Sequence, residues 1–557
     1  MIRPAFTACA VLLAVSASMA RASEPDQAAA EAGRLSATVK VLASDAFQGR
    51  APGTLGEART IAYLTARFKA LHLEPGGPRG SWTQSVPLVR TRISAPPVLR
   101  VVGMGAPIVW RQMDQAYVST VRPVDRVAIT SAPMVFVGYG VSAPERGWDD
   151  FKGVDLQGKV AVFLVNDPDF EAAPGEPVAG EFGGKAMTYY GRWTYKYEEA
   201  ARRGAVAALI VHEAPAAGYG WSTVIAPQGE AFDVARAPGD PKPLLLQGWL
   251  QRDAAVALFR RAGLDLDELK ARARRADFRP VSLGAARLEA SFPVAHTRVE
   301  SHNVLARLPG ATRPSETVMY GAHWDAYGIG SPDAQGRTIR PGANDDGLGV
   351  AGVLEIARDF ASGPRPERSV VFAVWTAEER GLLGSETYAE HPVYPLATTV
   401  ANFTMDILET AGPSRDVVLV GAGQDSLERD LARAAAAQGR TVTPDAHPER
   451  GLFYRADHFS LAKRGVPTLL LMAIGGGPDL VDGGRAAGDR WVSTYTAERY
   501  HKPGDAWSAD WDLRGAAQDV NLLYATGRDL AFSSRWPTWN AGSEFKATRD
   551  VTQSQRR

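Results

Sequence analysis

The chain has 557 residues, of which 45% are hydrophobic and 22% are charged, and this balance excludes a fully disordered protein. The length suggests two to four folded units. Basic and acidic residues number 62 each, so no excess positive charge is available to hold a nucleic acid or an anionic membrane surface.

The first 22 residues have the pattern of an export signal. Arg3 precedes a short apolar stretch from Ala5 to Val15, and Ala20 and Ala22 offer a cleavage site. The sequence holds no later apolar run of about 20 residues, so we expect no integral membrane segment after signal removal. Cys9 is the single cysteine and would be lost with the signal, which suits an oxidising compartment. We therefore predict a periplasmic or secreted protein.

Behind the signal, apolar residues recur at helical spacing between residues 28 and 73, and this pattern predicts two helices. A β-rich unit follows at 130–280, with dense proline and glycine between its short apolar segments. Its predicted strands are 134–138, 159–165 and 206–211, and its predicted helices are 195–203 and 254–271. With these elements the unit resembles a protease-associated domain inserted into a larger domain.

From residue 304 onward, predicted strands and helices alternate. Such alternation favours an α/β fold with a mainly parallel, buried sheet covered by helices. The predicted strands are 317–320, 369–375, 401–407, 417–420 and 467–472, and the helices are 348–360, 427–437 and 513–530. We expect 23–129 to be the N-terminal part of this α/β domain, 281–542 its main part and 543–557 a loose tail.

Chemically useful side chains stand at or near the ends of these strands. Each one alone has an ordinary structural explanation, such as a hydrogen-bonded histidine, a solvated turn or a helix cap. Taken as an ordered set they indicate a site, because ligands of such sheets bind at the carboxyl ends of the strands. The set comprises His323, Asp325, Asp345, Asp346, Glu378, Glu379, Asp406 and His501.

The donors in this set suit two divalent cations. Asp345 bridging both ions, Glu379 on one and Asp406 on the other supply three negative charges, and a bridging hydroxide completes the neutralisation. His323 and His501 add one nitrogen to each ion, which leaves the four-coordinate site open for reaction. Oxygen and imidazole donors suit two Zn²⁺ ions, and Mn²⁺ or Co²⁺ would also fit.

The adjacent glutamates can divide their roles. Neighbouring side chains on an extended backbone point in different directions, so Glu379 can bind metal while Glu378 stays free to move a proton. Asp325 lies two residues after His323 and can hydrogen-bond its imidazole, which would fix the tautomer.

In five motifs taken in order, the chain resembles the co-catalytic di-zinc aminopeptidases of the bacterial leucyl aminopeptidase type. The motifs are HWD at 323–325, GANDDG at 342–347, TAEERG at 376–381, the Asp of NFTMD at 402–406, and RYH at 499–501. The resemblance implies a zinc-exopeptidase-like fold and a cis peptide at Asp345-Asp346.

The resemblance also implies how the roles are shared. His323 and Asp406 would hold one metal, Glu379 and His501 the other, with Asp345 bridging and Glu378 as general base. In some relatives a tyrosine stabilises the oxyanion. Tyr454 is the candidate here, although its spacing differs by one from the family pattern, and Tyr500 is the competing donor. His458 is a rival metal ligand, with a structural role as the alternative.

These observations predict an exported zinc-dependent metallopeptidase, an aminopeptidase that cleaves N-terminal peptide bonds with a metal-bridged hydroxide. The alternatives are a carboxypeptidase or dipeptidase on the same scaffold, a glutaminyl-cyclase-like enzyme, and a non-catalytic binding protein. The oligomeric state is left open. Aromatic residues of the insert either pack its core or overhang the cleft and restrict peptide length. They are Tyr189, Tyr190, Trp193, Tyr195 and Tyr197.

Overall fold

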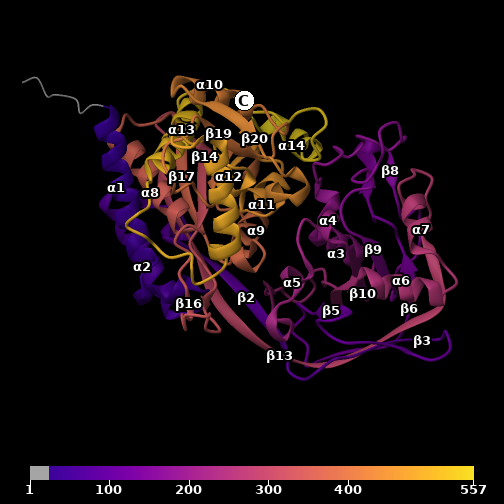
Figure 1. Ribbon diagram of the computed structural model, residues 1–557. Coiled ribbons are helices and arrows are strands. Elements are labelled where there is room, and N and C mark those ends of the chain that lie inside the picture. Colours follow the sequence, from indigo (N-terminus) through magenta and orange to yellow (C-terminus); the bar gives the residue numbers. More distant parts are fainter. Residues whose placement is uncertain (1–23, 557) are drawn as a thin grey trace, which may run out of the picture.

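The computed structural model describes residues 24–556, so the predicted signal and Cys9 lie outside the described part. These residues form two lobes, and the 28-residue strand β13 (Val281–Leu308) runs from one lobe into the other (Figure 1). Within residues 24–556, no helix is long and apolar enough to cross a membrane.

The larger lobe is built on a sheet with four parallel strands at its centre. β17 and β18 lie on either side of β14, and β21 follows β18, all in the same direction. Every residue of β17 and β18 is buried, which explains their continuous apolar sequence. The strands, in spatial order, are β11 (Ala231–Val234), β2 (Thr83–Ile93), the second half of β13, β17 (Arg368–Trp375), β14 (Arg313–His323), β18 (Thr399–Met405), β21 (Thr468–Leu471), β19 (Asp416–Val420) and β20 (Thr441–Pro444).

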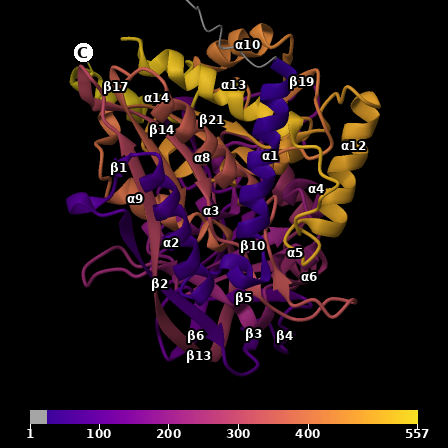
Figure 2. The ribbon, with the colours of Figure 1, turned by 90° about the vertical axis from the view of Figure 1, so that its left-hand side faces the viewer.

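Helices cover both faces of this sheet, as the mainly parallel α/β fold predicts. On the face toward the viewer in Figure 2 lie α1 (Glu24–Leu42), α2 (Leu55–Ala70), α8 (Gly347–Ser362) and α13 (Arg514–Ala531). Their apolar stripes pack with Tyr320 and Phe372 of the sheet in one core. The other face packs against α9 (Leu383–Glu390) and α11 (His458–Ala462), and α10 (Leu427–Ala437) and α12 (Gly484–Thr494) complete the lobe.

The smaller lobe is a second sheet with its own core. Its strands, in spatial order, are β4 (Ile108–Trp110), β3 (Val98–Val102), the first half of β13, β6 (Arg126–Phe136), β9 (Val160–Leu164), β10 (Ala207–His212), β12 (Leu246–Gln251) and β5 (Ala116–Ser119). Helix α3 (Trp193–Arg202) packs against β10. The sheet takes in strands on both sides of the predicted limits at 130 and 280, because β13 continues through both lobes without a break.

The predicted helix over 254–271 is two helices in the structure, α6 (Arg252–Arg261) and α7 (Leu266–Ala273). Gly263 adopts a left-handed conformation with φ of +76° and ends the first helix. Asp265 then caps the second, its side chain accepting a hydrogen bond from the Glu268 amide at 2.9 Å.

The C-terminal segment corrects the prediction of a loose tail at 543–557. Helix α14 (Lys546–Val551) lies against the larger lobe, with Phe545 buried beside Trp539. Arg549 is 4% exposed, and its guanidinium donates to the carbonyls of Leu396 and Thr399 at 3.1 and 2.9 Å. The polar sequence of this segment does not indicate the docking, because part of the contact is made by an arginine that donates to backbone carbonyls at and just before the start of β18.

Candidate metal centre

Three neighbouring parallel strands deliver side chains to one edge of the sheet. His323 is the last residue of β14 and pairs in register with Trp375, the last residue of β17. Glu378 and Glu379 follow β17 directly, and Asp406 follows β18. The topology therefore brings residues that lie far apart in the sequence together at the carboxyl ends of the strands.

Asp345 and His501 reach the same place from loops. Asp345 lies just before α8, and the next residue, Asp346, caps that helix by accepting from the Gly349 amide at 2.9 Å. The other carboxylate oxygen of Asp346 accepts from the His323 amide at 3.1 Å, which ties the loop to β14. The Asp345-Asp346 peptide is cis, as the resemblance implies. His501 follows α12 and a short π-helical turn.

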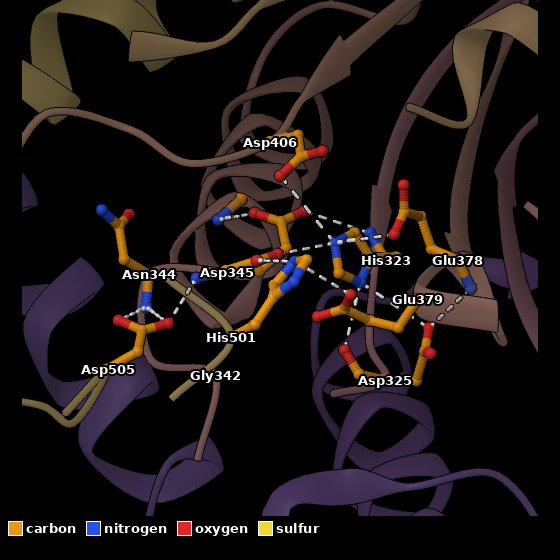
Figure 3. A network of polar contacts seen from close by, with 12 residues as sticks. His323, Asp325, Gly342, Asn344, Asp345, Glu378, Glu379, Asp406, His501 and Asp505 are labelled. Atoms are coloured by element: carbon orange, nitrogen blue, oxygen red, sulfur yellow. Dashed lines mark hydrogen bonds and ion pairs between the residues drawn. The ribbon is translucent and has the colours of Figure 1, made fainter. Parts of the chain in front are cut away.

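The side chains converge in two groups that share Asp345 (Figure 3). In the first group, Nε2 of His323 lies 3.2 Å from Oδ1 of Asp345 and 3.8 Å from Oδ1 of Asp406. In the second, Nε2 of His501 lies 3.3 Å from Oδ2 of Asp345 and 3.2 Å from Oε2 of Glu379. Within each group the potential ligand atoms lie within 4.8 Å of one another.

The donors of these groups lack the partners that buried polar atoms normally have. His323, Asp345 and Asp406 are at most 4% exposed. Yet Nε2 of His323, Oδ2 of Asp345 and Oδ1 of Asp406 make no hydrogen bond within the described residues. Buried carboxylates that converge without donors need a cation to offset their charge. Two divalent ions, one in each group, therefore fit the residues present.

Glu378 belongs to neither group but borders the first. Its Oε2 lies 3.9 Å from Nε2 of His323, and its backbone amide donates to Oδ1 of Asp325 at 3.0 Å. Burial raises the pKa of Glu378 well above the usual value, and the neighbouring Asp406 and Glu379 add to the rise. This environment suits a carboxyl group that accepts and returns protons.

Asp325 approaches His323 in a different way from the one predicted. The closest acceptor for Nδ1 of His323 is the backbone carbonyl oxygen of Asp325 at 3.1 Å, while the Asp325 carboxylate is at 3.6 Å. Either oxygen holds the imidazole with Nε2 toward Asp345. The carboxylate itself orients the Glu378 backbone, so Asp325 links the histidine to the free glutamate.

Two buried residues that the sequence analysis missed hold the loops of the centre. Arg50, fully buried, donates to the carbonyls of Trp324, Pro341 and Gly342 at 2.6 to 2.7 Å. Asp505 accepts from the Asn344 and Asp345 amides at 3.0 to 3.2 Å. Neither lies in a motif, and Arg50 lies more than 270 residues before the loops it binds, so no sequence signal marked it.

Backbone strain accompanies the site. Ala377, Ile407 and His501 all adopt positive φ values, 52°, 57° and 59°, although they are not glycines. The first precedes the glutamate pair, the second follows Asp406, and the third is itself in the second group. Such conformations cost about 1–3 kcal/mol each and persist where surrounding structure imposes them, often at functional sites.

The two candidate tyrosines occupy different positions. Tyr454 is 4% exposed and donates its hydroxyl to Oε1 of Glu544 at 2.8 Å, so a substrate carbonyl would have to replace that contact. Tyr500 packs directly on His501, with ring centroids 3.7 Å apart. His458 lies outside both ligand groups, and burial lowers its pKa to about 3.

A cleft of about 1540 Å³ joins the centre to the smaller lobe. Its walls include Asp345, Glu378 and His501 of the larger lobe. The aromatic cluster Tyr189, Tyr190, Trp193, Tyr195 and Tyr197 also lines it. Tyr190, Tyr195 and Tyr197 are each less than 9% exposed, whereas Tyr189 and Trp193 are only half-buried. The cluster therefore both fills the core of the smaller lobe and faces the cleft.

Comparisons with known proteins find similarity in the part of the chain that carries the centre. Residues 303–525 match the family described as Peptidase family M28. The chain is 33% identical over 147 residues to the Probable lipoprotein aminopeptidase LpqL of Mycobacterium tuberculosis, which covers 26% of this chain and 25% of that protein. It is 38% identical over 121 residues to the Aminopeptidase NAALADL1 of Mus musculus, covering 20% of this chain and 15% of that protein. The matches thus span a quarter or less of these curated relatives.

Solved structures resemble the chain over more of its length. An aminopeptidase from Aneurinibacillus sp. strain AM-1 is 19% identical, with a TM-score of 0.48, and the alignment covers 90% of this chain and 93% of that one. BSAP, a zinc aminopeptidase from Bacillus subtilis, is 19% identical with a TM-score of 0.42, covering 90% and 95%.

Proposed function

We propose, from the premise that residues 303–525 form a domain of peptidase family M28, that this protein is a zinc-dependent aminopeptidase that hydrolyses N-terminal peptide bonds. One observation carries the proposal. Two groups of ligand atoms share Asp345, and a carboxyl group that belongs to neither, that of Glu378 with its side chain 10% exposed, lies beside them. The names of the mycobacterial and mouse relatives, both aminopeptidases, support the choice among exopeptidases.

The five ligands divide between two ions. His323 and Asp406 would hold one, Glu379 and His501 the other, and Asp345 both. A bound pair of divalent cations supplies Lewis acidity, which lowers the pKa of a coordinated water and polarises a carbonyl oxygen. Asp325, Arg50 and Asp505 keep the ligands in register before any ion or substrate arrives.

Glu378 performs the proton transfers in this proposal. Its carboxylate faces the first group, and the hydrogen bond from its own amide to Asp325 fixes the start of the turn. It accepts a proton from the attacking water and returns that proton to the leaving amine. Tyr500, beside His501, and Tyr454, farther along the wall, are the two candidates for donating to the carbonyl oxygen as it gains charge.

We further propose that the protein acts in the periplasm or outside the cell, and that the smaller lobe is a protease-associated insert. The export pattern in residues 1–22, a single cysteine within it, and a mycobacterial relative named as a lipoprotein support the location. The separate sheet and core of the smaller lobe support the insert.

The test combines metal analysis with a substrate panel. Purified protein should contain close to two zinc ions per chain and cleave aminoacyl-arylamides, with activity lost to a chelator and restored by Zn²⁺. A peptide with a free N-terminus should be cleaved and its N-acetylated form should not, because an aminopeptidase requires the free amine. Cleavage of the acetylated peptide alone would favour a carboxypeptidase. Metal binding without turnover of any substrate would refute the proposal that the protein is an enzyme.

A further inference from the structure

Two arginines in the wall of the cleft lack acidic partners. Arg192 immediately precedes α3 of the smaller lobe, and Arg455 comes from the segment before α11 of the larger lobe. Neither forms an ion pair with a carboxylate of residues 24–556, and Glu378 acts on Arg455 only at longer range. The two guanidinium groups face the same cleft from opposite lobes and repel each other electrostatically.

Arg192 is the more unusual of the two. It is 6% exposed, and its Nε makes no hydrogen bond with any described residue, although the side chain lines the cleft. Burial lowers the pKa of Arg192 to about 10, and Arg455 contributes to the lowering. A buried cation without a counter-ion is costly, so the fold maintains here a charge that it does not neutralise itself.

Arg455 connects this charge to the metal centre. Its Nη2 donates to the Tyr500 hydroxyl at 3.2 Å, and the Tyr500 ring packs against that of His501. Arg455 and Tyr500 therefore link the wall of the cleft to a candidate metal ligand, and Arg192 lines the same cleft. A substrate bound at the centre would extend along this wall.

Other arginines that line the cleft are neutralised by the protein. Nη2 of Arg236 lies 3.0 Å from Oδ2 of Asp233, and Nη1 of Arg202 forms an ion pair with Oε2 of Glu199. Unlike these neighbours, Arg192 and Arg455 form no ion pair with a carboxylate of the described residues. A guanidinium group presents paired donors that match a carboxylate, and such charge-assisted hydrogen bonds are stronger than neutral ones.

We propose that Arg192, together with Arg455, binds a carboxylate of the peptide substrate beyond the scissile bond. This proposal rests on the peptidase function proposed above. The arginines would repel the positively charged N-terminus, which places them on the side of the leaving peptide. The carboxylate belongs either to the C-terminus of a short peptide or to an acidic side chain, and both offer the same pair of oxygens.

The experiment measures kcat/KM ratios for matched peptides, with X an N-terminal residue accepted in the arylamide panel. One arm compares X-Gly with X-Gly-amide, and the other compares X-Glu-amide with X-Gln-amide. We expect wild-type protein to favour the acid by about tenfold or more in at least one arm, the effect of about one charge-assisted hydrogen bond. In Arg192→Gln that ratio should fall toward one.

A matched control removes a different positive charge from the same cleft. Arg236→Gln should keep the wild-type ratio, because Arg236 already has a carboxylate partner. The wild-type ratio alone tests the proposal even if Arg192→Gln fails to fold. Ratios within twofold of one in both arms of wild-type protein, or an unchanged ratio in folded Arg192→Gln, would overturn it. Hydrolysis without a preference for the acid over the amide refutes only the proposed arginine subsite. If no arylamide or peptide is hydrolysed, the proposed peptidase function is refuted as well.

Discussion

Each lobe buries acidic side chains in its interior, and the two lobes offset their charge in different ways. In the smaller lobe, Asp150, Asp167 and Lys196 are all fully buried, and the lysine, which donates to two backbone carbonyls, is near enough to act electrostatically on both aspartates. Both oxygens of Asp150 accept hydrogen bonds, from the Val141 amide and the Trp148 indole at 2.9 and 2.8 Å. Both oxygens of Asp167 also accept hydrogen bonds, from the amide and the hydroxyl of Thr188.

The larger lobe has no such arrangement at its centre. Asp345 and Asp406 each have an oxygen that accepts no hydrogen bond from a described residue. The comparison teaches how to distinguish a structural acidic cluster from a metal centre. Where protein donors saturate the carboxylates, the cluster is complete as folded. Where the oxygens converge on one another without donors, the missing charge must come from outside.

The largest effect should separate catalysis from charge neutralisation within the larger lobe. Glu378→Gln should keep its zinc but lose about 10²- to 10⁴-fold in kcat, since Glu378 lies outside both ligand groups and is the proton carrier of the proposed mechanism. Glu379→Ala should lose metal as well as turnover. Arylamide kinetics with metal analysis of both variants checks this. Equal turnover in Glu378→Gln and wild type would reject the assignment.

Metal removal should destabilise one lobe selectively. At a free zinc concentration of a thousand times Kd, binding stabilises the folded state by about 4 kcal/mol, and a chelator removes that contribution. Hydrogen exchange followed by peptide mass spectrometry should show faster exchange around Asp345 and Asp406. Exchange around Asp150 and Lys196 should hardly change. Equal acceleration in both lobes would contradict the distinction drawn here.

Lys196→Met should destabilise the smaller lobe rather than the metal centre of the larger lobe. Removing the cation takes away a charge that lowers the pKa of both buried aspartates, and it leaves two backbone carbonyls without their donor, so we expect a loss of about 1–3 kcal/mol. Urea unfolding should show this loss with or without chelator. Lys159→Met removes a lysine whose partner, Asp155, is exposed, and should change the unfolding midpoint little. A Lys196→Met protein as stable as wild type would show that the lysine is not the counter-charge.

The smallest effect concerns peptide length. Trp193 is half-buried in the wall of the cleft, so Trp193→Ala should gain a few-fold in kcat/KM on long peptides relative to short ones. Trp221, also in the smaller lobe, does not line the cleft, and Trp221→Ala serves as the matched control. An unchanged length profile in Trp193→Ala would indicate that the aromatic cluster only packs the lobe.

Much of the fold followed from local patterns. Buried runs such as 369–375 and 401–407 predicted β17 and β18 because strands covered on both faces are apolar throughout. The long strand β13 was not predicted, since its halves serve different sheets and no single alternation runs through it. Helix α14 was missed because its docking relies on Arg549, which reads as a surface residue in the sequence.

For the centre, the sequence determined which donors are available and in what order, because histidine and carboxylate chemistry is fixed by residue type. It could also place them at strand ends, because strand limits are local. Only the tertiary structure decided which oxygens meet which nitrogens, that the Asp325 carbonyl holds His323, and that Arg50 and Asp505 secure the loops. It also decided that Arg192 of the smaller lobe shares a cleft with the centre. These contacts join residues separated by up to several hundred positions, and such pairings are set by packing of the whole chain rather than by any local pattern.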